Sequence, residues 1–241
     1  MQLFAKTDVG KVRTINQDAF YINTLSNGAA LAVVCDGMGG ASAGDIASKT
    51  AVEIISQYVI NAYNPAMSSD DIIRLLDNAI NSANLEVFTL SKKDEQLSGM
   101  GTTVVATIAF ENQAVICSAG DSRAYLINEQ ITQITRDHTM VQSLVELGKI
   151  SAEEAKTHPE KNIITRALGV EDNIVIDSYC VDISKDDIIL LCTDGMSNYV
   201  SENSILSIVK NNALDKITTI LIDEANSGGG RDNITVAVVS H

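Results

Sequence analysis

The stretch "LAVVCDGMGG", residues 31–40, runs from five apolar residues into Asp36 and then into a loop that is mostly glycine. The apolar run predicts a buried β-strand that ends at the aspartate. A glycine-rich turn after a strand is also typical of phosphate-binding loops, but the two familiar spacings fail here. Ser42 occupies the third glycine position of the dinucleotide fingerprint, and Asp45 occupies the lysine position of the P-loop. The carboxylate of Asp36 therefore indicates a bound cation rather than a bare pyrophosphate.

The same arrangement recurs further along the chain. "IILLCTDGMS" joins an apolar run to Asp194, "AVICSAGDSRA" places Asp121 just after a run, and "GGGRDNITVAVV" places Asp232 just before one. Asp-Gly is an ordinary turn dipeptide, so each aspartate taken singly has a structural explanation. Four such sites, each tied to a long apolar run, indicate instead that the side chains project at one rim of a β-structure. Oxygen ligands without a nearby pair of Cys or His favour Mg²⁺ or Mn²⁺ over zinc, and the bare Gly37 lets its carbonyl approach a metal.

Helical and strand patterns occur in blocks around these sites. Residues 44–63 and 68–88 have apolar residues at helical spacing, and the second stretch begins with Ser and Asp caps. From Thr102 to Ile134 short β-rich runs are joined by turns too short for parallel crossovers, which predicts an antiparallel meander. Further strands are predicted at 173–181, 187–193 and 233–240, with a pair of helices between the last two. Antiparallel sheet with helices on the outside is an α+β arrangement.

Length and composition limit the remaining possibilities. A chain of 241 residues with 45% hydrophobic content can bury a full core, and no stretch is typical of a linker or a repeat, so we predict one domain over residues 1–241. The formal charge of −14 disfavours nucleic acid and anionic membranes as partners. The N-terminal "MQLFAKTDVGKVR" lacks the apolar core of a signal peptide, and no run is long and apolar enough for a membrane span. We expect a cytoplasmic protein.

The four cysteines support this expectation. Cys35, Cys117, Cys180 and Cys192 lie within or at the end of apolar strand-like runs and show no C-x-x-C spacing. They are predicted to be small buried hydrophobic residues in a reducing compartment, in preference to disulfide partners.

At this point a resemblance to a known family emerges. The motifs "RTINQDAF" (13–20), "VCDGMGG" (34–40), "SAGDSRAY" (118–125), "LLCTDGMS" (190–197) and "GGGRDNITVAVV" (228–239) occur in the order found in the bacterial branch of the metal-dependent (PPM, type 2C) Ser/Thr protein phosphatases. The segment from Thr135 to Gly169 also resembles that branch. The resemblance covers essentially the whole chain. It implies a central antiparallel β-sandwich flanked by helix pairs in four layers, α-β-β-α, with a flap segment at about 137–166 beside a metal cleft.

The resemblance also implies a set of metal ligands. Asp36 would bridge two metals, the Gly37 carbonyl would complete the shell of one, and Asp194 and Asp232 would hold the other. Asp121 resembles a ligand of a more weakly held third metal. The implied cofactors are therefore two Mg²⁺ or Mn²⁺ ions per chain with a weaker third.

Two further residues have implied roles around the substrate. Asp18 resembles a residue that orders metal-bound water, and Arg13 resembles the phosphate-binding arginine, for which a guanidinium fork is well suited. The implied activity is hydrolysis of phosphoserine and phosphothreonine in proteins by metal-activated water. Uncatalysed phosphate-monoester hydrolysis is so slow that positioning and charge neutralisation by two metals are needed, and no protein nucleophile is required.

Several positions depart from the family pattern. Met38 stands where eukaryotic members carry a histidine proposed as general acid, and Ala41 stands where many bacterial members have histidine, so we assign no general acid. Gln17 replaces a common glutamate, and Asn198 occupies a position often filled by an aspartate of the third metal site. The three histidines are expected to be structural or solvated rather than catalytic, namely His138, His158 and His241.

The implied partners are phosphorylated proteins, in particular a Ser/Thr protein kinase and its substrates, and we expect a monomer. Three alternatives stay open. The first is a dedicated phosphatase of an anti-sigma-factor antagonist. The second is an inactive phosphoprotein-binding homologue, which would be expected to have lost metal aspartates. The third is a metal-dependent nuclease, which would need a basic groove that the sequence does not suggest.

Overall fold

The strands form two antiparallel sheets packed face to face. A computed structural model of the chain describes residues 1–40 and 43–240. The first sheet has the order β1 (Gln2–Asp8), β11 (Ile234–Ser240), β10 (Ile188–Cys192), β7 (Arg123–Ile127) and β8 (Ile131–Gln133). The second has the order β2 (Asp18–Thr24), β3 (Ala30–Met38), β5 (Val104–Phe110), β6 (Gln113–Ala119) and β9 (Asp177–Asp182), and the short β4 (Gly101–Thr102) pairs with β3.

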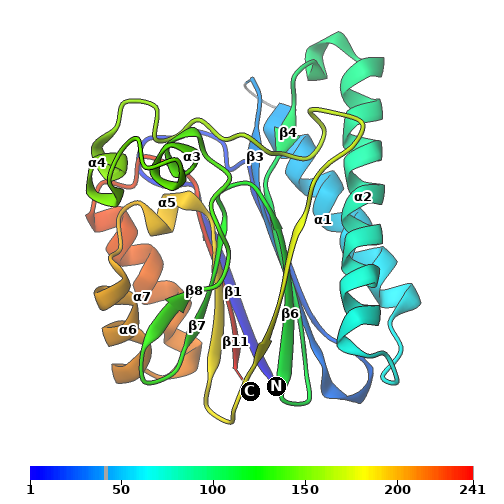
Figure 1. The fold of residues 1–241 in the computed structure, drawn as a ribbon, viewed down its shortest axis with the longest axis vertical. Coiled ribbons are helices and arrows are strands. Elements are labelled where there is room, and N and C mark those ends of the chain that lie inside the picture. The colour runs from blue at the N-terminus through cyan, green and yellow to red at the C-terminus, as the bar shows by residue number, and fades with distance from the viewer. Residues whose placement is uncertain (41–42, 241) are drawn as a thin grey trace.

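Helices cover the outer face of each sheet (Figure 1). α1 (Ala43–Ala62) and α2 (Ser69–Lys93) lie on the second sheet, and α6 (Glu202–Asn211) and α7 (Leu214–Ser227) lie on the first. Shorter elements are α3 (Met140–Glu146), α4 (Ala152–Thr157), α5 (Asp194–Ser197) and two 3-10 turns at Ser26–Gly28 and Glu95–Leu97. The predicted four-layer α-β-β-α architecture is confirmed.

Each sheet is apolar on both faces, which explains the long apolar runs in the sequence. In β3, Leu31, Val33 and Cys35 pack against α1 and α2, whereas Ala30, Ala32 and Val34 face the other sheet. The same alternation in β10 and β11 builds one cluster under α6 and α7 and shares another between the sheets. Because side chains alternate along a strand, a strand between two layers is buried on both faces and is apolar at most positions.

The predicted meander between Thr102 and Ile134 is wrong in one respect. β5 pairs with β6 and β7 pairs with β8, but β6 and β7 belong to different sheets. The connection turns at Gly120, whose φ of +116° lies in the region that favours glycine. The chain therefore crosses from one sheet to the other at Gly120 and Asp121.

The structure also tests the prediction that the four cysteines are buried. Cys35, Cys117 and Cys192 are buried as predicted, but Cys180 is exposed. It lies on the edge strand β9, on the side opposite Tyr179 and Val181, which pack between the sheets. The expectations for Ala41, Ser42 and His241 fall outside the described residues.

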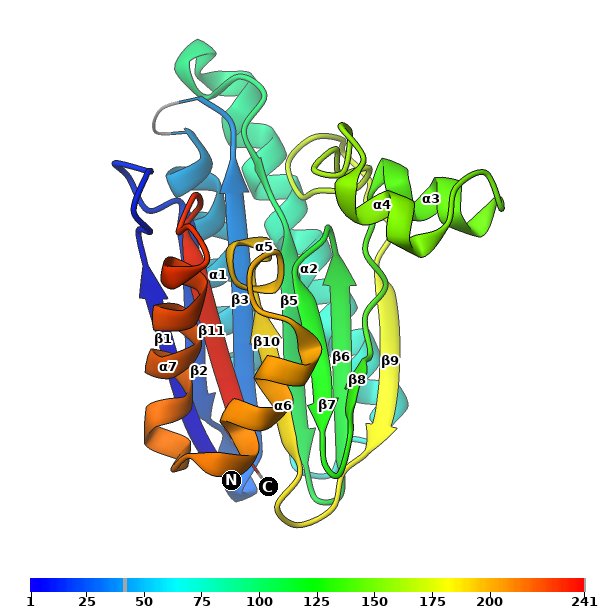
Figure 2. The same cartoon turned by 90° about the vertical axis from the view of Figure 1, so that its left-hand side faces the viewer.

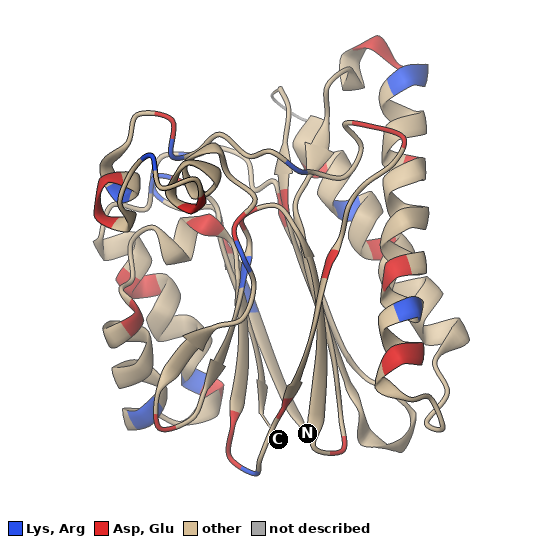
Figure 3. Ribbon diagram, in the orientation of Figure 1, with Lys and Arg blue, Asp and Glu red and all other residues tan. Residues whose placement is uncertain are grey.

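The segment that carries α3 and α4 lies beside the upper end of the two sheets, outside the four layers (Figure 2). Acidic positions are spread over both helix pairs and the turns (Figure 3). No helix within residues 1–40 and 43–240 is both long enough and apolar enough to cross a membrane.

Candidate metal centre

The antiparallel pairing brings the strand-end aspartates to one end of the sandwich. β10 pairs with both β7 and β11, so the residues that follow β10 lie beside those that precede its two neighbours. Asp194 follows β10, while Asp121 precedes β7 and Asp232 precedes β11. Asp36, near the end of β3, completes the group from the second sheet. The predicted common rim is therefore present.

These aspartates line one cleft of about 660 Å³ at the upper end of the sandwich. The lining includes the predicted metal and phosphate residues and two residues of the flap segment. Its members are Arg13, Gln17, Asp36, Gly37, Met38, Gly39, Gly40, Thr103, Asp121, Asn162, Ile164, Asp194, Asp232 and Asn233. Among the described residues of this lining, Arg13 is the one basic side chain, so the cleft has no basic groove of the kind a nuclease needs.

The backbone around Asp36 is held on both sides. Its N–H donates to Thr103 Oγ1 at 3.0 Å, and its carbonyl accepts from the Thr103 N–H at 2.9 Å and from Thr102 Oγ1 at 2.8 Å. These bonds fix the strand end, so the position of the carboxylate is set by the sheet rather than by a free loop. The sequence had offered no signal for this role of Thr102 and Thr103.

Asp18 is buried directly opposite Asp36 in the β2–β3 register. Its Oδ2 accepts from Thr193 Oγ1 at 2.9 Å and from Thr235 Oγ1 at 2.7 Å. Its Oδ1 is buried and has no hydrogen-bond partner among the described residues. A buried acceptor left without a donor is costly, so this oxygen fits the predicted neighbour of a metal or of ordered water.

Burial and mutual repulsion raise the pKa values of three carboxylates that line the cleft and of the neighbouring Asp18. Burial raises the pKa of Asp18 to about 7, against hydrogen bonds from the two threonines that lower it. Burial and then the charge of Asp194 raise the pKa of Asp121 to about 7, and burial and then Asp232 raise that of Asp194 to about 6. Burial and then Asp18 raise the pKa of Asp36 well above its usual range. Divalent cations would relieve this repulsion.

Two of the carboxylates that line the cleft accept from Arg13 and Asn198. Arg13 Nη2 donates to Asp232 Oδ2 at 2.9 Å, and Asn198 Nδ2 donates to Asp194 Oδ2 at 3.0 Å. Within the described part of the chain, no three His, Cys, Asp or Glu side chains already converge as a preformed metal cage. The donor set nevertheless fits Mg²⁺ or Mn²⁺, because it consists of hard oxygens that repel one another and include the unpartnered Asp18 Oδ1.

The structure adds a second reason for glycine at position 37. A Cβ on Gly37 would lie 2.0 Å from the carbonyl oxygen of Gly44 and 2.6 Å from that of Gln17. The first turn of α1 thus packs directly on the strand end. The Gln17 amide in turn donates to the Gly40 carbonyl at 3.2 Å, a bond that a glutamate at this position could not donate.

Asn233 is a residue whose importance the sequence did not reveal. Its Oδ1 accepts from the Gln17 N–H at 2.8 Å, and its Nδ2 donates to the carbonyls of Val9 and Ile15 at 3.0 Å each. These bonds tie the β1–β2 loop, which carries Arg13, to the residue beside Asp232. The partners lie more than 200 positions apart in sequence, so only the fold could identify them.

The flap segment contributes Asn162 and Ile164 to the cleft. His138 is buried at the root of this segment, and His158 ends α4 in its outer part. Neither lines the cleft within the described residues, so neither has a position suited to a general acid.

Comparison with known proteins determines the family. Residues 10–221 match the family model for protein phosphatase 2C, which is most of the chain. The chain belongs to the protein phosphatase 2C family. It is 39% identical over 236 residues to the serine/threonine phosphatase stp of Listeria monocytogenes, covering 97% of this chain and 93% of that protein.

Solved structures of the family agree with the fold. The serine/threonine phosphatase Stp1 from Staphylococcus aureus matches with a TM-score of 0.93 and 35% identity, over 100% of this chain and 94% of the other. The catalytic domain of the serine threonine protein phosphatase PstP, in complex with two manganese ions, matches with a TM-score of 0.86 and 32% identity, over 99% and 97% of the two chains. The predictions of a metal-dependent Ser/Thr protein phosphatase and of its fold are confirmed at the level of the family.

Proposed function

We propose that this protein removes phosphate from phosphoserine and phosphothreonine side chains in the cleft lined by Asp36, Asp194 and Asp232. The observation that carries the proposal is the gathering of carboxylates from both sheets around one cleft, with raised pKa values and one guanidinium beside them. An inactive phosphoprotein-binding homologue would have no need to retain this costly arrangement.

Each residue has a role in this proposal that follows from its position. Asp36, the Gly37 carbonyl, Asp194 and Asp232 would hold two Mg²⁺ or Mn²⁺ ions. Such a pair supplies an activated water and neutralises charge on the phosphoryl oxygens. Asp121 lines the same cleft, where it would hold a third, weaker ion.

The remaining two residues act on water and phosphate. Asp18 Oδ1 has no protein donor among the described residues, so it could accept a hydrogen bond from ordered water beside Asp36. Arg13 is half exposed at the cleft, and its guanidinium can exchange the Asp232 carboxylate for two phosphate oxygens. Substrate binding therefore draws Arg13 away from a proposed metal ligand.

The biological setting is part of the proposal. The substrate would be a phosphorylated protein, the opposing enzyme a bacterial Ser/Thr kinase, and the active form a cytoplasmic monomer. The single sandwich with its own cleft supports action without a second subunit, and three buried cysteines suit a reducing compartment. The flap segment, residues 137–166, would contact the substrate through Asn162 and Ile164. A dedicated phosphatase of an anti-sigma-factor antagonist has no specific observation in its favour.

The test is phosphate release from pSer, pThr and pTyr peptides with and without Mn²⁺. We expect turnover of pSer and pThr peptides that depends on Mn²⁺ and stops in EDTA. Asp36→Asn serves as the inactive control, because it keeps the fold of β3 but removes the anionic ligand. Equal turnover in EDTA, or equal turnover by Asp36→Asn, would contradict the proposal.

A further inference from the structure

His138 is a buried polar residue that the proposed reaction does not use. Only 3% of its surface is exposed, and its ring lies between the β6–β7 connection and β9. Its Nδ1 accepts a hydrogen bond from the Gly120 N–H at 3.0 Å. Its own N–H donates to the Gly120 carbonyl at 2.9 Å, so His138 holds both polar groups of the residue before Asp121.

The hydrogen bonds determine which ring nitrogen carries the proton. Because Gly120 donates to Nδ1, that nitrogen must be unprotonated, and the proton of the neutral ring lies on Nε2. Nε2 lies 3.0 Å from Asp177 Oδ2, which accepts from it, and also 3.0 Å from Arg166 Nη1. Because Arg166 can only donate, this second contact is not a hydrogen bond to the protonated Nε2, and Arg166 donates to Asp177 instead. Asp177 also accepts from Arg166 Nη1 at 2.7 Å. Burial lowers the pKa of His138, which keeps the ring in the neutral form that can accept from Gly120.

Backbone hydrogen bonds at and beside His138 also join the beginning of the flap segment to its end. The Thr165 N–H donates to the His138 carbonyl at 2.8 Å, and the Met140 N–H donates to the Ile163 carbonyl at 2.9 Å. Ile164, which lines the cleft, therefore lies next to Thr165, which is hydrogen-bonded directly to His138.

Gly120 has little freedom on its other side. A Cβ there would lie 2.6 Å from Thr103 Cβ, and Thr103 is the residue that binds the backbone of Asp36. The turn that carries Asp121 is thus enclosed between the Asp36 strand end and His138.

We propose that His138 is a positioning residue that holds Asp121 and the flap segment in fixed relation to the metal cleft. Nδ1 holds Gly120, the residue before Asp121, and Nε2 holds Asp177, which in turn binds Arg166 at the end of the flap segment. This inference rests on the proposed function, because it assigns to Asp121 a part in metal binding.

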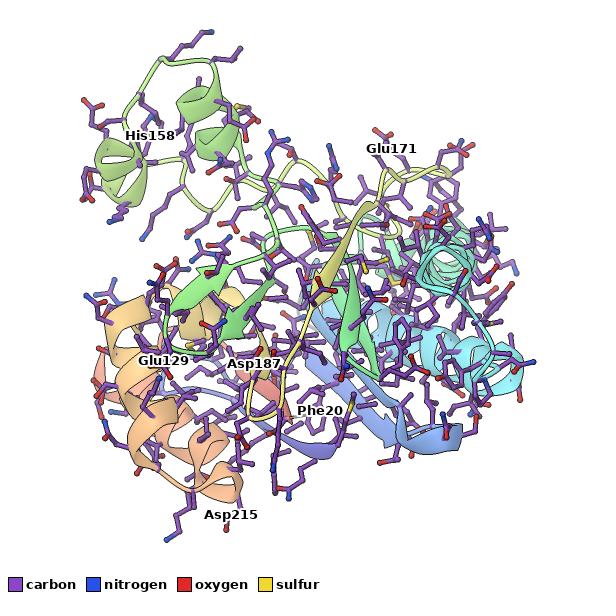
Figure 4. All side chains as sticks on the ribbon, turned by 60° about the horizontal axis from the view of Figure 1, so that its bottom comes forward. Phe20, Glu129, His158, Glu171, Asp187 and Asp215 are labelled. Carbon is purple, nitrogen blue, oxygen red and sulfur yellow. The ribbon has the colours of Figure 1, made fainter. Side chains whose placement is uncertain are left out.

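Two isosteric substitutions separate the contact made by Nδ1 from the contact made by Nε2. In His138→Asn the amide oxygen can take the place of Nδ1 as an acceptor, whereas in His138→Gln the amide nitrogen can take the place of Nε2 as a donor. His138→Gln should therefore leave the Gly120 N–H without its acceptor, and His138→Asn should remove the Nε2 donor from Asp177 while the bond from Arg166 remains. His158→Gln is the matched control, because its Nδ1 also accepts a backbone N–H, from Glu160 at 3.2 Å, but in the outer part of the segment (Figure 4).

The measurements are hydrogen exchange of the Gly120 amide by NMR, calorimetric titration with Mn²⁺, and phosphopeptide kinetics. In His138→Gln we expect Gly120 to exchange about tenfold faster and the weakest Mn²⁺ site to bind about five- to tenfold less tightly, as loss of one buried hydrogen bond implies. In His138→Asn we expect both to stay within about twofold of wild type while KM rises, because the flap side loses its anchor. His158→Gln should match wild type throughout.

Identical Gly120 exchange and Mn²⁺ binding in His138→Gln and wild type would overturn the proposal. Equal losses in His138→Gln and His138→Asn would also overturn it, since the ring would then only fill space. If either variant fails to fold, the wild-type protein still gives a test. A scalar coupling between the Gly120 and His138 Nδ1 nitrogens is expected, and its absence contradicts the bond. Wild type without phosphopeptide turnover would instead contradict the proposed function, because Gly120 exchange and Mn²⁺ binding are measured independently of it.

Discussion

At the root of the flap segment, carboxylates are paired with cations. Asp137 accepts from Arg123 through both oxygens, and Asp177 accepts from Arg166 and His138. In the cleft, the described residues provide one such ion pair, between Arg13 and Asp232. The two regions lie on either side of the Gly120–Asp121 turn, yet they differ in whether a cationic side chain pairs with each carboxylate.

The pKa values follow this difference. Burial alone raises the pKa of Asp177, but hydrogen bonds from His138 and Arg166 outweigh it, and the pKa lies below the usual value. Burial and neighbouring carboxylates raise the pKa values of Asp36, Asp121 and Asp194 in the cleft, and of the buried Asp18 opposite Asp36. Partners that donate to a carboxylate favour its charged form, whereas carboxylates that repel one another destabilise the metal-free protein. The cleft therefore depends on cations that the flap root does not need.

The largest expected effect comes from removing a cleft carboxylate. Asp36→Asn, Asp194→Asn and Asp232→Asn should each lower phosphopeptide turnover by at least about 10³-fold, because charge in the transition state loses its metal. Steady-state kinetics in saturating Mn²⁺ measures the loss. The matched control is Asp71→Asn, a carboxylate paired with Arg74 on α2, which should leave turnover unchanged. Near-normal turnover by any of the three cleft variants would remove the distinction between the regions.

The second effect is on stability. Mn²⁺ that binds only the folded protein should stabilise it by about 2.7 kcal/mol at about 100 times its Kd, and calorimetric scans over a Mn²⁺ series measure the rise in Tm. Asp36→Asn should show a smaller rise. A Tm that stays flat over the series would mean that the carboxylates do not form a metal site.

The metal-free protein should also lose stability as pH rises. The pKa values of Asp194, at about 6, and of Asp18 and Asp121, at about 7, lie above that of an aspartate in an unfolded chain. The folded state then holds more protons, so this stability is fully present below about pH 4 and is lost as pH rises through 6 to 7. Scans in EDTA at pH 5.5 and 8 test this, and Asp121→Asn should reduce the difference. A higher Tm at pH 8 would reverse the predicted sign.

Arg13→Ala should have a smaller effect, on substrate binding. Loss of the guanidinium should raise KM about tenfold with some loss of kcat, because one charged phosphate contact disappears. Calorimetry should show Mn²⁺ binding no weaker than in wild type, since Asp232 loses a competing partner. Arg13→Lys keeps the charge without the guanidinium fork, so its KM should lie between those of wild type and Arg13→Ala. Unchanged phosphopeptide kinetics would make Arg13 only a partner of Asp232.

The smallest effect is expected at Asn198. Its amide donates to Asp194, and Asn198→Asp would add a carboxylate beside the proposed third site. We expect the half-activating Mn²⁺ concentration to fall about threefold, because an added carboxylate strengthens binding of a hard cation. Asp121→Asn should lower activity without emptying the binuclear pair. If Asn198→Asp leaves the Mg²⁺ and Mn²⁺ dependence unchanged, Asn198 serves only as the cap that ends α5.

The sequence could predict features that depend on local patterns. Apolar runs that end in aspartate predicted the strands and the acidic rim, because strand alternation and turn chemistry act over a few residues. It could not predict the crossing at Gly120, because the short "GDS" connection also suits a hairpin. The hydrogen bonds of Asn233 and His138 likewise depend on partners distant in sequence, and the identity of a polar residue does not indicate which distant residue it will contact.

The most direct measurement is anomalous diffraction at the manganese edge from crystals of the protein grown with Mn²⁺. We predict two strong peaks about 3.5–4 Å apart in the cleft beside Asp36, a weaker peak beside Asp121, and none at the Asp137–Arg123 and Asp177–Arg166 pairs. A single peak away from Asp36, or no peak in the cleft, would contradict this prediction.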